Sequence, residues 1–314
     1  MATNTPRYTD SETAKEMMSE YHVGTLTVAA QAILANSTPQ VSQTSSSADR
    51  PVFLDAATWC PATLTSKKIV SHDTRILTFA LQHGNQTLGL PIGQHLMLML
   101  PAPSGSQALI RAYTPISSPA QLGTMDLLVK IYASTPTGPG GKMTTALEAL
   151  PLDSRVLVKG PIGKFTYLGR GRAIVAGASR AVTGFVMICG GSGITPIFQV
   201  LRAVMGDVAD ATVCTVLDGN RSEDDILCRA ELEEFAAQTG EEGERVRCTV
   251  VHTLSRAGEG WEGRRGRVDA ELIGKWARPG QGRVALVCGP LAMERSVKAA
   301  LGEMGWAEED LVFF

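Results

Sequence analysis

Several features that mark particular protein classes are missing from this sequence. Its 314 residues contain no apolar run approaching the roughly 20 residues of a membrane-spanning helix. The N-terminus has neither the basic segment nor the apolar segment of a secretory signal. The formal net charge is -2, so the chain lacks the basic surplus typical of nucleic-acid-binding domains. These absences predict a cytoplasmic protein that binds neither membranes nor nucleic acid.

Metal-binding patterns are missing as well. The six cysteines form no CxxC pair and match no common zinc spacing, and the five histidines are spread along the chain. We therefore expect no metal site and reduced thiols. Cys214 and Cys248 lie in apolar, β-branched runs, which predicts that they are small core residues. Asp153, Asp207 and Asp210 are interpreted as solvated loop residues.

What is present is an ordinary globular composition, large enough for two domains. Hydrophobic residues make up 44% of the chain and charged residues 19%, which suffices for two apolar cores. Residues 36–50 are rich in Ser, Thr, Gln and Pro, which predicts a mobile linker. A short helix is expected before the linker, over Ser11 to Leu26.

Residues 52–172 are expected to form antiparallel β structure. Short β-prone runs alternate with breaks rich in Gly and Pro, a spacing typical of a small barrel. The runs are Ala62–Val70, Thr74–Leu81, His95–Leu100, Leu109–Tyr113, Met125–Ile131 and Arg155–Lys159. One segment, 141–147, is predicted to be a turn that opens a short helix.

Residues 185–314 show a different pattern, in which strands and helices alternate. Phe185–Cys189 has the composition of a buried strand, and the apolar residues from Ile197 to Val204 then recur at helical spacing. Further strands are expected at Thr212–Leu217, Val246–Val251 and Val284–Cys288, and helices at Asp225–Gln238, Asp269–Trp276 and Ala292–Met304. This alternation predicts a doubly wound parallel α/β domain, joined to the first domain by a connection over residues 173–184.

A glycine-rich turn follows the first strand of the second domain. The sequence GGSGITP at 190–196 places Pro196 near the first turn of a helix, where proline fits best. Glycines there let a pyrophosphate approach the backbone, and the helix N-terminus offers free N–H groups. On this motif alone, a nucleotide-binding turn and a plain tight turn are about equally supported.

Five motifs in a fixed order carry a more specific signal. They are RAYTPISS at 111–118, GGKMT at 140–144, GGSGITP at 190–196, DGNRSEDDIL at 218–227 and CGP at 288–290, and Phe314 ends the chain. Together they resemble the cytochrome b5 reductase family, within the ferredoxin–NADP reductase superfamily. The resemblance covers about residues 55–314. It implies a β + α/β architecture, with a six-stranded antiparallel FAD-binding barrel at 52–172 and an NADH-binding domain at 185–314.

The resemblance also implies residue roles on the flavin side. Arg111 would bind the FAD pyrophosphate because a guanidinium suits bidentate phosphate contacts. Tyr113 would pack against the flavin, and Thr114 would lie near its reactive nitrogen. The remaining cofactor-binding residues expected in this part of the chain are Ser117, Lys130, Tyr132, Gly140, Gly141, Lys142, Met143 and Thr144, of which those at 140–144 would bind the FAD pyrophosphate.

On the nicotinamide side, the resemblance makes Cys288 a thiol that positions the nicotinamide ring. An isolated cysteine would more often be a small core residue. Cys288, Thr114 and Lys130 form the expected catalytic set, although no protein nucleophile is needed because the cofactors carry the chemistry. The other expected nucleotide-binding residues are Gly191, Ser192, Gly193, Thr195, Pro196, Asp225, Gly289, Pro290 and Phe314.

The choice between NADH and NADPH is predicted from the stretch at 218–225. It carries four acids against one arginine, Arg221, and the resemblance points to Asp225 as the acid that would repel a 2′-phosphate. These charges favour NADH. Arg221 is the complication, because it could pair with the phosphate of NADPH.

The first part of the chain adds a context. Residues 11–26 resemble the closing segment of the cytochrome b5 domain in assimilatory nitrate reductases, so residues 1–51 are expected to be the tail of a haem domain plus a hinge. The haem-binding HPGG motif is absent and Asp10 stands where a haem-ligating histidine would be, so no haem is expected. The resemblance as a whole is to the C-terminal FAD and NADH part of a eukaryotic assimilatory nitrate reductase. It implies hydride transfer from NADH to FAD, then single-electron transfer to a cytochrome b5-type haem domain.

Two alternatives stay open at this point. One is a stand-alone NADH-cytochrome b5 reductase, against which the N-terminal segment and the lack of a membrane anchor both count. The other is a nucleotide-sensing module that binds FAD without turnover. Binding alone would not require nicotinamide-side residues such as Lys130 and Cys288, so the module is the weaker alternative.

Overall fold

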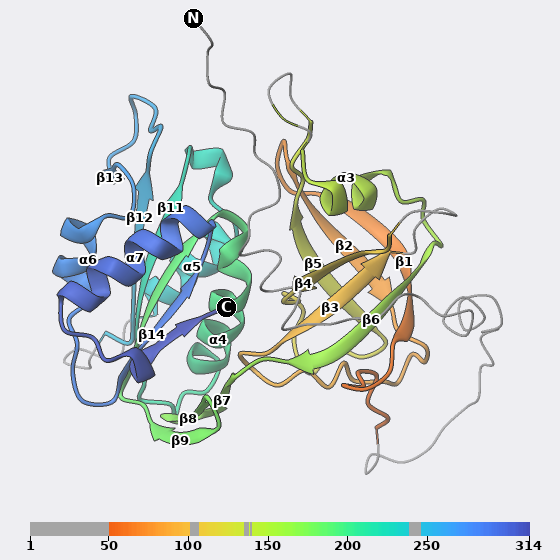
Figure 1. The fold of residues 1–314 in the computed structure, drawn as a ribbon, viewed down its shortest axis with the longest axis horizontal. Helices are drawn as coiled ribbons and strands as arrows, with labels where there is room; N and C mark the ends of the chain where they lie inside the picture. The colour runs from red at the N-terminus through yellow and green to blue at the C-terminus, as the bar shows by residue number, and fades with distance from the viewer. Residues whose placement is uncertain (1–49, 101–106, 135–137, 139, 239–245) are drawn as a thin grey trace, which may run out of the picture.

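The structure is a computed structural model, and it describes residues 50–100, 107–134, 138, 140–238 and 246–314. Two sheets stand side by side in Figure 1, and a small third sheet lies below the left-hand one. The expected helix at 11–26 and the expected linker at 36–50 lie outside the described residues.

The first domain is a curled six-stranded antiparallel sheet, as predicted. Its strand order is β4-β3-β6-β1-β2-β5, so β4 and β5 are the edge strands. The strands are β1 (Cys60–Ile69), β2 (Thr74–Ala80), β3 (His95–Leu100), β4 (Leu109–Tyr113), β5 (Thr124–Lys130) and β6 (Arg155–Ile162). Alternate residues face the inside of the curl, where side chains such as Leu64, Phe79 and Leu127 are fully buried. Helix α3 (Lys142–Ala149) covers one end and buries Met143 and Leu147 in the same core.

A three-stranded antiparallel sheet connects the two domains. It contains β7 (Phe165–Gly169), β8 (Arg172–Val175) and β9 (Ala178–Ala181). The sequence placed the start of this connection at residue 173, whereas in the structure the connecting sheet begins at Phe165. Phe165 and Tyr167 pack edge-on against Phe185 of the second domain, which draws the chain away from the first sheet directly after β6.

Asp210 was expected to be a solvated loop residue, and this interpretation is wrong. Its carboxylate is buried and accepts hydrogen bonds from the Tyr167 hydroxyl at 2.5 Å and from the backbone N–H groups of Arg170 and Thr212. These bonds tie the connecting sheet to the start of the second domain's sheet. The sequence did not reveal the role because Tyr167 and Arg170 lie far away in the chain and meet Asp210 only in the tertiary fold.

The second domain is a six-stranded parallel sheet with helices on both faces, as predicted. Its strand order is β13-β12-β11-β10-β14-β15. The strands are β10 (Gly184–Gly190), β11 (Val213–Asn220), β12 (Cys248–Leu254), β13 (Arg264–Arg265), β14 (Arg283–Cys288) and β15 (Leu311–Phe313). Every residue of β10 is buried, because strands lie on both sides and helices on both faces. Cys214 and Cys248 are buried neighbours in β11 and β12, which confirms their expected place in the core.

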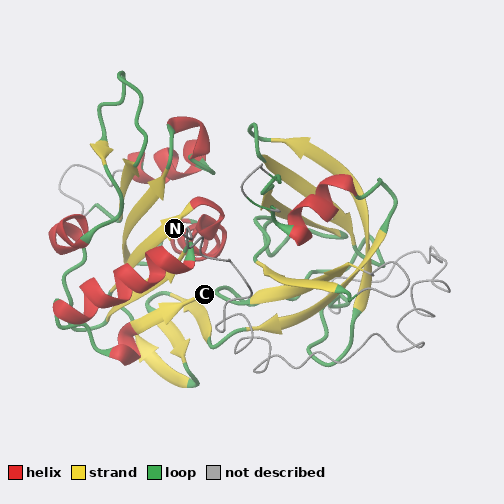
Figure 2. Cartoon of the chain, turned by 45° about the horizontal axis from the view of Figure 1, so that its top comes forward, coloured by secondary structure: helices red, strands yellow, loops and turns green. Residues whose placement is uncertain are grey.

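The helices divide into two pairs around this sheet. Helix α4 (Ile194–Met205) and helix α5 (Arg229–Ala237) pack on the face that carries Phe185 and Met187, and α6 (Ala270–Trp276) and α7 (Leu291–Glu303) pack on the face that carries Val186 and Ile188. The yellow strands run between these helices in Figure 2. The helix expected to begin at Asp225 begins at Arg229. A 3-10 turn at Glu223–Asp225 precedes it, because Ser222 and Asp225 form a capping box there.

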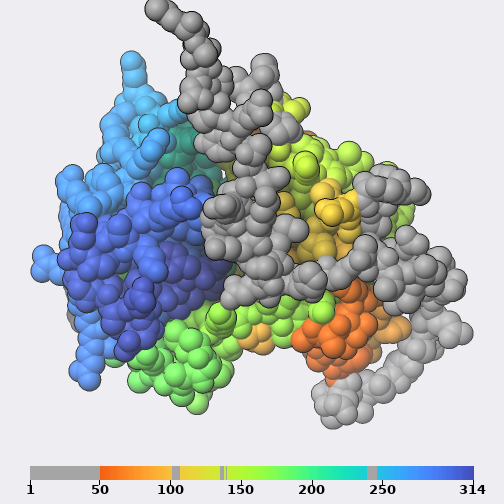
Figure 3. Space-filling view, viewed as in Figure 1, coloured from red at the N-terminus to blue at the C-terminus, as the bar shows by residue number. Residues whose placement is uncertain are grey.

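Helix α4 is the part of the second domain nearest the first sheet (Figure 1). Ile92, Ile116 and Leu128 of the first domain pack against the apolar cluster that α4 helps to build. The two domains accordingly lie side by side in the space-filling view, with the connecting strands below (Figure 3). No helix among the described residues is long and apolar enough to cross a membrane.

Candidate active site between the two domains

The order of the parallel strands fixes where a nucleotide can bind. From β10 the chain moves outward to β11 and β12, and it then crosses back to place β14 on the other side of β10. Neighbouring loops therefore diverge at the carboxyl ends of β10 and β14, which creates the crevice where open α/β sheets bind ligands. The GGSGITP turn follows β10, and Cys288-Gly289-Pro290 follows β14.

The two loops touch at Gly193. A Cβ atom built on Gly193 would lie 2.2 Å from the carbonyl oxygen of Cys288 and 2.9 Å from the backbone nitrogen of Gly289. Only glycine allows this approach, so the residue has a steric reason to be there. Gly190 is similarly crowded, since a Cβ there would lie 2.7 Å from the sulfur of Met293.

The N-terminus of α4 is suited to an anion. Helix α4 begins after Gly193 and has no side-chain cap, so its first N–H groups have no side-chain acceptor. The Thr195 hydroxyl donates to the carbonyl of Ser192 at 3.2 Å, which shapes the turn, and Pro196 is buried in the first helical turn. This uncapped helix end behind a glycine turn fits the pyrophosphate of a dinucleotide.

Cys288 is the last residue of β14 and lies in register with Cys189 of β10. Burial raises the pKa of the Cys288 thiol to about 12, so the group is a neutral thiol at physiological pH. The next residue, Gly289, donates its N–H to Glu294 Oε1 at 3.1 Å, and Pro290 is the N-cap of α7. A neutral thiol on a rigid strand end can contact a ring and position it, and it is a poor nucleophile.

The chain end reaches the domain boundary. Phe314 donates its backbone N–H to the carbonyl of Val287 in β14 at 3.0 Å. Its ring makes an edge-on contact with Phe165 of the connecting sheet, with ring centroids 6.0 Å apart. The C-terminus lies between the two large sheets in Figure 1.

A second uncapped helix end lies in the first domain. Helix α3 follows Gly140 and Gly141, and no side chain caps it. Gly140 has a φ of +72°, and a Cβ there would lie 2.6 Å from the carbonyl oxygen of Tyr132. Tyr132 accepts the N–H of Gly141 at 2.8 Å and donates its own N–H to the Thr144 hydroxyl at 3.2 Å. The glycine turn is therefore held close to the end of β5, with its helix N–H groups available to a phosphate.

The residues expected to bind the flavin differ in exposure. Arg111 and Ala112 are exposed on the edge strand β4, and the Arg111 guanidinium donates to the carbonyl of Ile110 at 2.7 Å. Thr114 is buried, and burial raises the pKa of Tyr113 above its usual range. Lys142 is exposed at the start of α3. Met143 is buried in the domain core, so only its backbone can reach a cofactor.

Lys130 and Asp225, expected from the sequence as separate cofactor contacts, meet across the domain boundary. Lys130 Nζ lies 2.7 Å from Asp225 Oδ1 and 2.9 Å from Asp73 Oδ2. Burial opposes the charge on Lys130, but the bonds from both carboxylates raise its pKa. Burial also opposes ionisation of Asp225, yet the bonds from Lys130 and Ser222 hold its pKa down at about 2. His72 adjoins this cluster, where its ring, Asp73 and Asp225 offer ligand atoms within 4.8 Å of one another.

Comparison with known proteins agrees with this geometry. The family model described as the oxidoreductase FAD-binding domain matches residues 61–167, and the oxidoreductase NAD-binding domain matches residues 187–299. The crystal structure of the cytochrome b5 reductase domain of Ulva prolifera nitrate reductase is similar, with a TM-score of 0.77 and 34% identity. The match covers 84% of this chain and 100% of that one. The chain belongs to the cytochrome b5 reductase domains of nitrate reductases.

Two curated relatives are more similar in sequence. A nitrate reductase (NADPH) from Leptosphaeria maculans is 54% identical over 97% of this chain, and one from Emericella nidulans is also 54% identical over 97%. The chain spans about a third of the length of these relatives, 34% and 35% respectively. The predicted family, fold and cofactors, FAD and a nicotinamide nucleotide, are thus confirmed.

Two glycine turns, each followed by an uncapped helix N-terminus, fit these cofactors. We call them the two cradles: residues 190–196 before α4 and residues 140–144 at the start of α3. When bound, FAD accepts a hydride and releases electrons one at a time, which is chemistry that protein side chains do not supply. The structure brings together GGSGITP with CGP, and GGKMT with Tyr132. It leaves Arg111 beside the exposed face of the edge strand.

Sequence reasoning missed several residues of this reductase domain. One is Asp73, which forms a second ion pair with Lys130 beside that of Asp225. The others are Gln199 and Arg202 of α4, which form hydrogen bonds with loops of the FAD-binding domain. Gln199 is buried although it is polar, among the mostly apolar residues of α4. That contrast is a signal in the sequence, since a buried polar side chain needs a partner.

Proposed function

We propose that this chain is the electron-input part of a nitrate reductase. It takes a hydride from a nicotinamide nucleotide onto FAD and passes electrons singly to a cytochrome b5-type haem domain. In the complete enzyme, the final acceptor is nitrate at a molybdenum centre. The observation that carries the proposal is the 54% identity over almost the whole chain to nitrate reductases three times its length. A cytoplasmic location is part of the proposal, and the six free cysteines support a reducing compartment.

One of the two glycine turns binds the nicotinamide nucleotide, and the other binds FAD. The turn at 190–196 binds the nucleotide pyrophosphate, and Cys288 holds the nicotinamide ring against the flavin. The turn at 140–144 and Arg111 bind the FAD pyrophosphate, while Tyr113 and Thr114 contact the flavin. Lys130 reaches the domain boundary, where its ammonium can exchange an acidic partner for a nucleotide phosphate.

We further propose that the preferred donor is NADPH, which replaces the NADH preference inferred from the sequence. Both relatives of 54% identity are named for NADPH. Three of the four acids counted at 218–225 already have partners. Asp218 bonds to His252 at 2.9 Å, Glu223 to Arg229 at 2.7 Å and Asp225 to Lys130 at 2.7 Å. The charges of Glu223 and Asp225 are therefore offset by Arg229 and Lys130, and Asp218 is buried, so these three acids do not repel a 2′-phosphate as free, exposed carboxylates would.

Two arginines supply the opposite charge. The backbone N–H of Arg256 donates to the carbonyl of Arg221 at 2.7 Å, which places the two residues together beyond the ends of β11 and β12. Both are exposed, and neither has an ion-pair partner among the described residues. Two exposed arginines on adjacent loops at this edge of the sheet suit a phosphate on the adenosine ribose.

The first experiment is anaerobic mixing of FAD-loaded protein with NADPH or NADH. Flavin absorbance at about 450 nm should bleach, and added cytochrome b5-type haem domain should then be reduced by one electron per haem. Protein that keeps its flavin yet shows no bleaching with either nucleotide would be a binding module and not a reductase. Bleaching without haem reduction would remove the proposed partner.

The donor preference is tested by kcat/KM for both nucleotides. The double variant Arg221→Gln, Arg256→Gln should raise the KM for NADPH by at least about tenfold and leave the KM for NADH nearly unchanged, since one lost phosphate contact is worth about 1.5–3 kcal/mol. Asp225→Ser should change the preference by less than about threefold. A wild-type preference for NADH, removed by Asp225→Ser, would restore the role that the sequence suggested for Asp225.

A further inference from the structure

Helix α4 connects the two cofactor-binding regions as one rigid element. Its N-terminal end is the nucleotide turn, which ends at Gly193, and its second half faces loops of the FAD-binding domain. Twelve helical residues span about 18 Å at the usual rise per residue. Any bond between the far half of α4 and the flavin-binding loops therefore relates the nucleotide site to the flavin site.

Arg202 makes such bonds. Its Nη2 donates to the carbonyl of Ser117 at 2.6 Å, and its Nη1 donates to the carbonyl of Ile116. The guanidinium also lies over the ring of Phe198, one turn earlier in the helix, 5.3 Å from its centroid. A planar fork that is stacked on one face and bonded to two consecutive carbonyls has little freedom to move.

The bonded carbonyls belong to the loop that continues directly from Tyr113 and Thr114. The same loop is held from its other side by β5, because Ile116 donates its N–H to the Asp126 carbonyl at 2.9 Å and Asp126 donates its N–H to the Ser117 hydroxyl at 3.1 Å. The loop therefore lies between a fixed strand of its own domain and Arg202 of the other domain.

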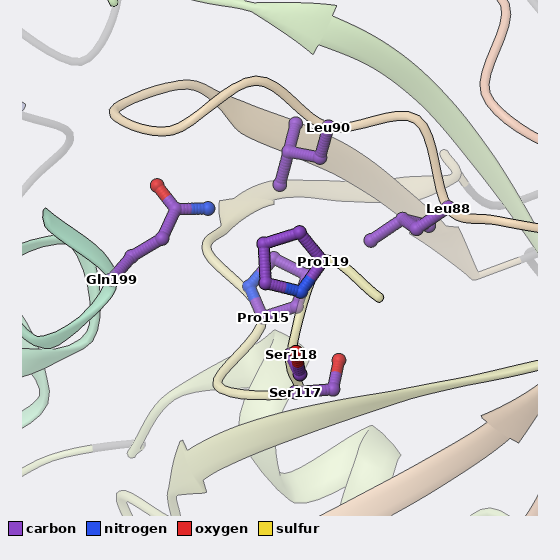
Figure 4. A pocket seen from close by; sticks show the side chains of 7 residues that line it. All are labelled: Leu88, Leu90, Pro115, Ser117, Ser118, Pro119 and Gln199. Carbon is purple, nitrogen blue, oxygen red and sulfur yellow. The ribbon is translucent and has the colours of Figure 1, made fainter. Parts of the chain in front are cut away.

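Gln199 adds a second bond between the domains. Its Oε1 accepts the backbone N–H of Gly93 at 2.6 Å in a buried position. Figure 4 shows Gln199 extending from α4 toward a small cavity beside Pro115, which the loop residues Ser117, Ser118 and Pro119 also line. Two polar side chains on the same helix thus form hydrogen bonds with two different loops of the FAD-binding domain.

We propose that Arg202, assisted by Gln199, is a positioning residue for hydride transfer. It touches neither reacting ring. It fixes the loop that carries Tyr113 and Thr114 relative to the helix whose N-terminus binds the nucleotide, and so sets the separation and angle of the two rings. This inference rests on the proposed hydride transfer. Positioning matters for that step because a misplacement of about 1 Å between reacting groups can lower the rate on the order of a hundredfold.

The test uses the whole chain loaded with FAD. In Arg202→Met, reduction of FAD at saturating NADPH should slow by about tenfold to a hundredfold, while the Kd for NADPH changes by less than about threefold. Arg202→Lys should recover part of the rate, since an ammonium can reach a carbonyl but cannot form the two-pronged contact. Arg278→Met, which removes an exposed arginine on the far side of the domain, should match the wild type.

A spectroscopic reading separates positioning from a general loss of structure. The long-wavelength absorbance that arises when flavin and nicotinamide rings stack should weaken in Arg202→Met, with FAD content unchanged. Wild-type bleaching tests the reductase function itself, and the ratio of variant to wild-type rate tests this inference, so their failures are distinguishable.

Two outcomes would overturn the positioning role. One is a folded, FAD-loaded Arg202→Met whose reduction rate is within twofold of the wild type. The other is a rate that falls only in proportion to nucleotide affinity or FAD content, which marks a structural role. If Arg202→Met fails to fold, Gln199→Ala takes its place, with an expected loss of about tenfold, and an unchanged rate there would equally reject the proposal.

Discussion

Adding one methyl group at Gly193 should slow hydride transfer from the nucleotide to FAD while leaving both domains folded. In Gly193→Ala, the new Cβ would lie 2.2 Å from the Cys288 carbonyl oxygen, and real Cβ contacts are essentially never shorter than 3.0 Å. One loop must therefore move by at least about 0.8 Å, the difference between these two distances. Both loops contact the nucleotide in the proposed site, so the movement displaces the nicotinamide whichever loop yields.

The displacement sets the expected magnitude. A shift of about 1 Å in a reacting group costs on the order of a hundredfold in rate, and overpacking costs about 1–3 kcal/mol of stability. Flavin reduction at saturating NADPH should therefore slow by about a hundredfold in Gly193→Ala. FAD content should stay unchanged, because the FAD-binding residues belong to the other domain.

The assay is stopped-flow bleaching of the flavin in the variant and in a matched control. Gly302→Ala is the control, since a Cβ on Gly302 meets nothing within 4 Å and the residue lies on the exposed side of α7. The control should reduce its flavin at the wild-type rate and gain about 0.5–1 kcal/mol of stability, as alanine does over glycine in a helix. Gly193→Ala that reduces flavin within twofold of the wild type would refute the close packing of the two loops.

Three further outcomes are expected. Cys288→Ala should keep FAD and slow hydride transfer about a hundredfold with a much smaller change in NADPH affinity, measured as kcat and Kd; a kcat within twofold of the wild type would remove the positioning role. The pKa of Asp225 is lowered from 3.8 to about 2, so its ion pair stabilises the protein above pH 3.8 and this contribution is lost as the pH falls toward 2. Urea unfolding should accordingly show Asp225→Asn to be less stable by on the order of 2 kcal/mol at pH 7, with a gap that closes on acidification; a gap that widens would contradict the assignment. Arg111→Ala should weaken FAD binding at least about tenfold in equilibrium titrations, and unchanged affinity would mean that the exposed guanidinium does not bind the pyrophosphate.

Much of the fold could be predicted because it depends on local pattern. The strands of the FAD-binding domain begin and end within a few residues of their predicted limits, since β-prone runs and their glycine breaks alternate regularly. The helical stripe from Ile197 to Val204 lies in α4, where its apolar residues pack on the sheet. Short strands such as β8 and β15 were missed because they have only three or four residues and little periodicity.

The site was predicted in its backbone elements and less well in its side-chain partners. A glycine turn before a helix is a local feature, so both cradles were visible in the sequence. Partner choice depends on the tertiary fold, and residues far apart in the chain, such as Asp73, Lys130 and Asp225, gave no sign of meeting. The charge count at 218–225 likewise treated every acid as free, since the sequence does not show which acids are already paired.

The position of β14 has a consequence for how the molecule is assembled. Gly184 of β10 pairs with Val213 on one side, but its partner on the other side is Arg283, near the end of the chain. The FAD cradle needs only residues up to Thr144 and the strands around it, whereas the nucleotide crevice exists only after β14 has docked. Because such long-range pairing is slow, we expect a newly made chain to pass through a stage that can hold FAD but cannot accept electrons. A chain truncated before β14 should stay at that stage, yellow and inert toward NADPH.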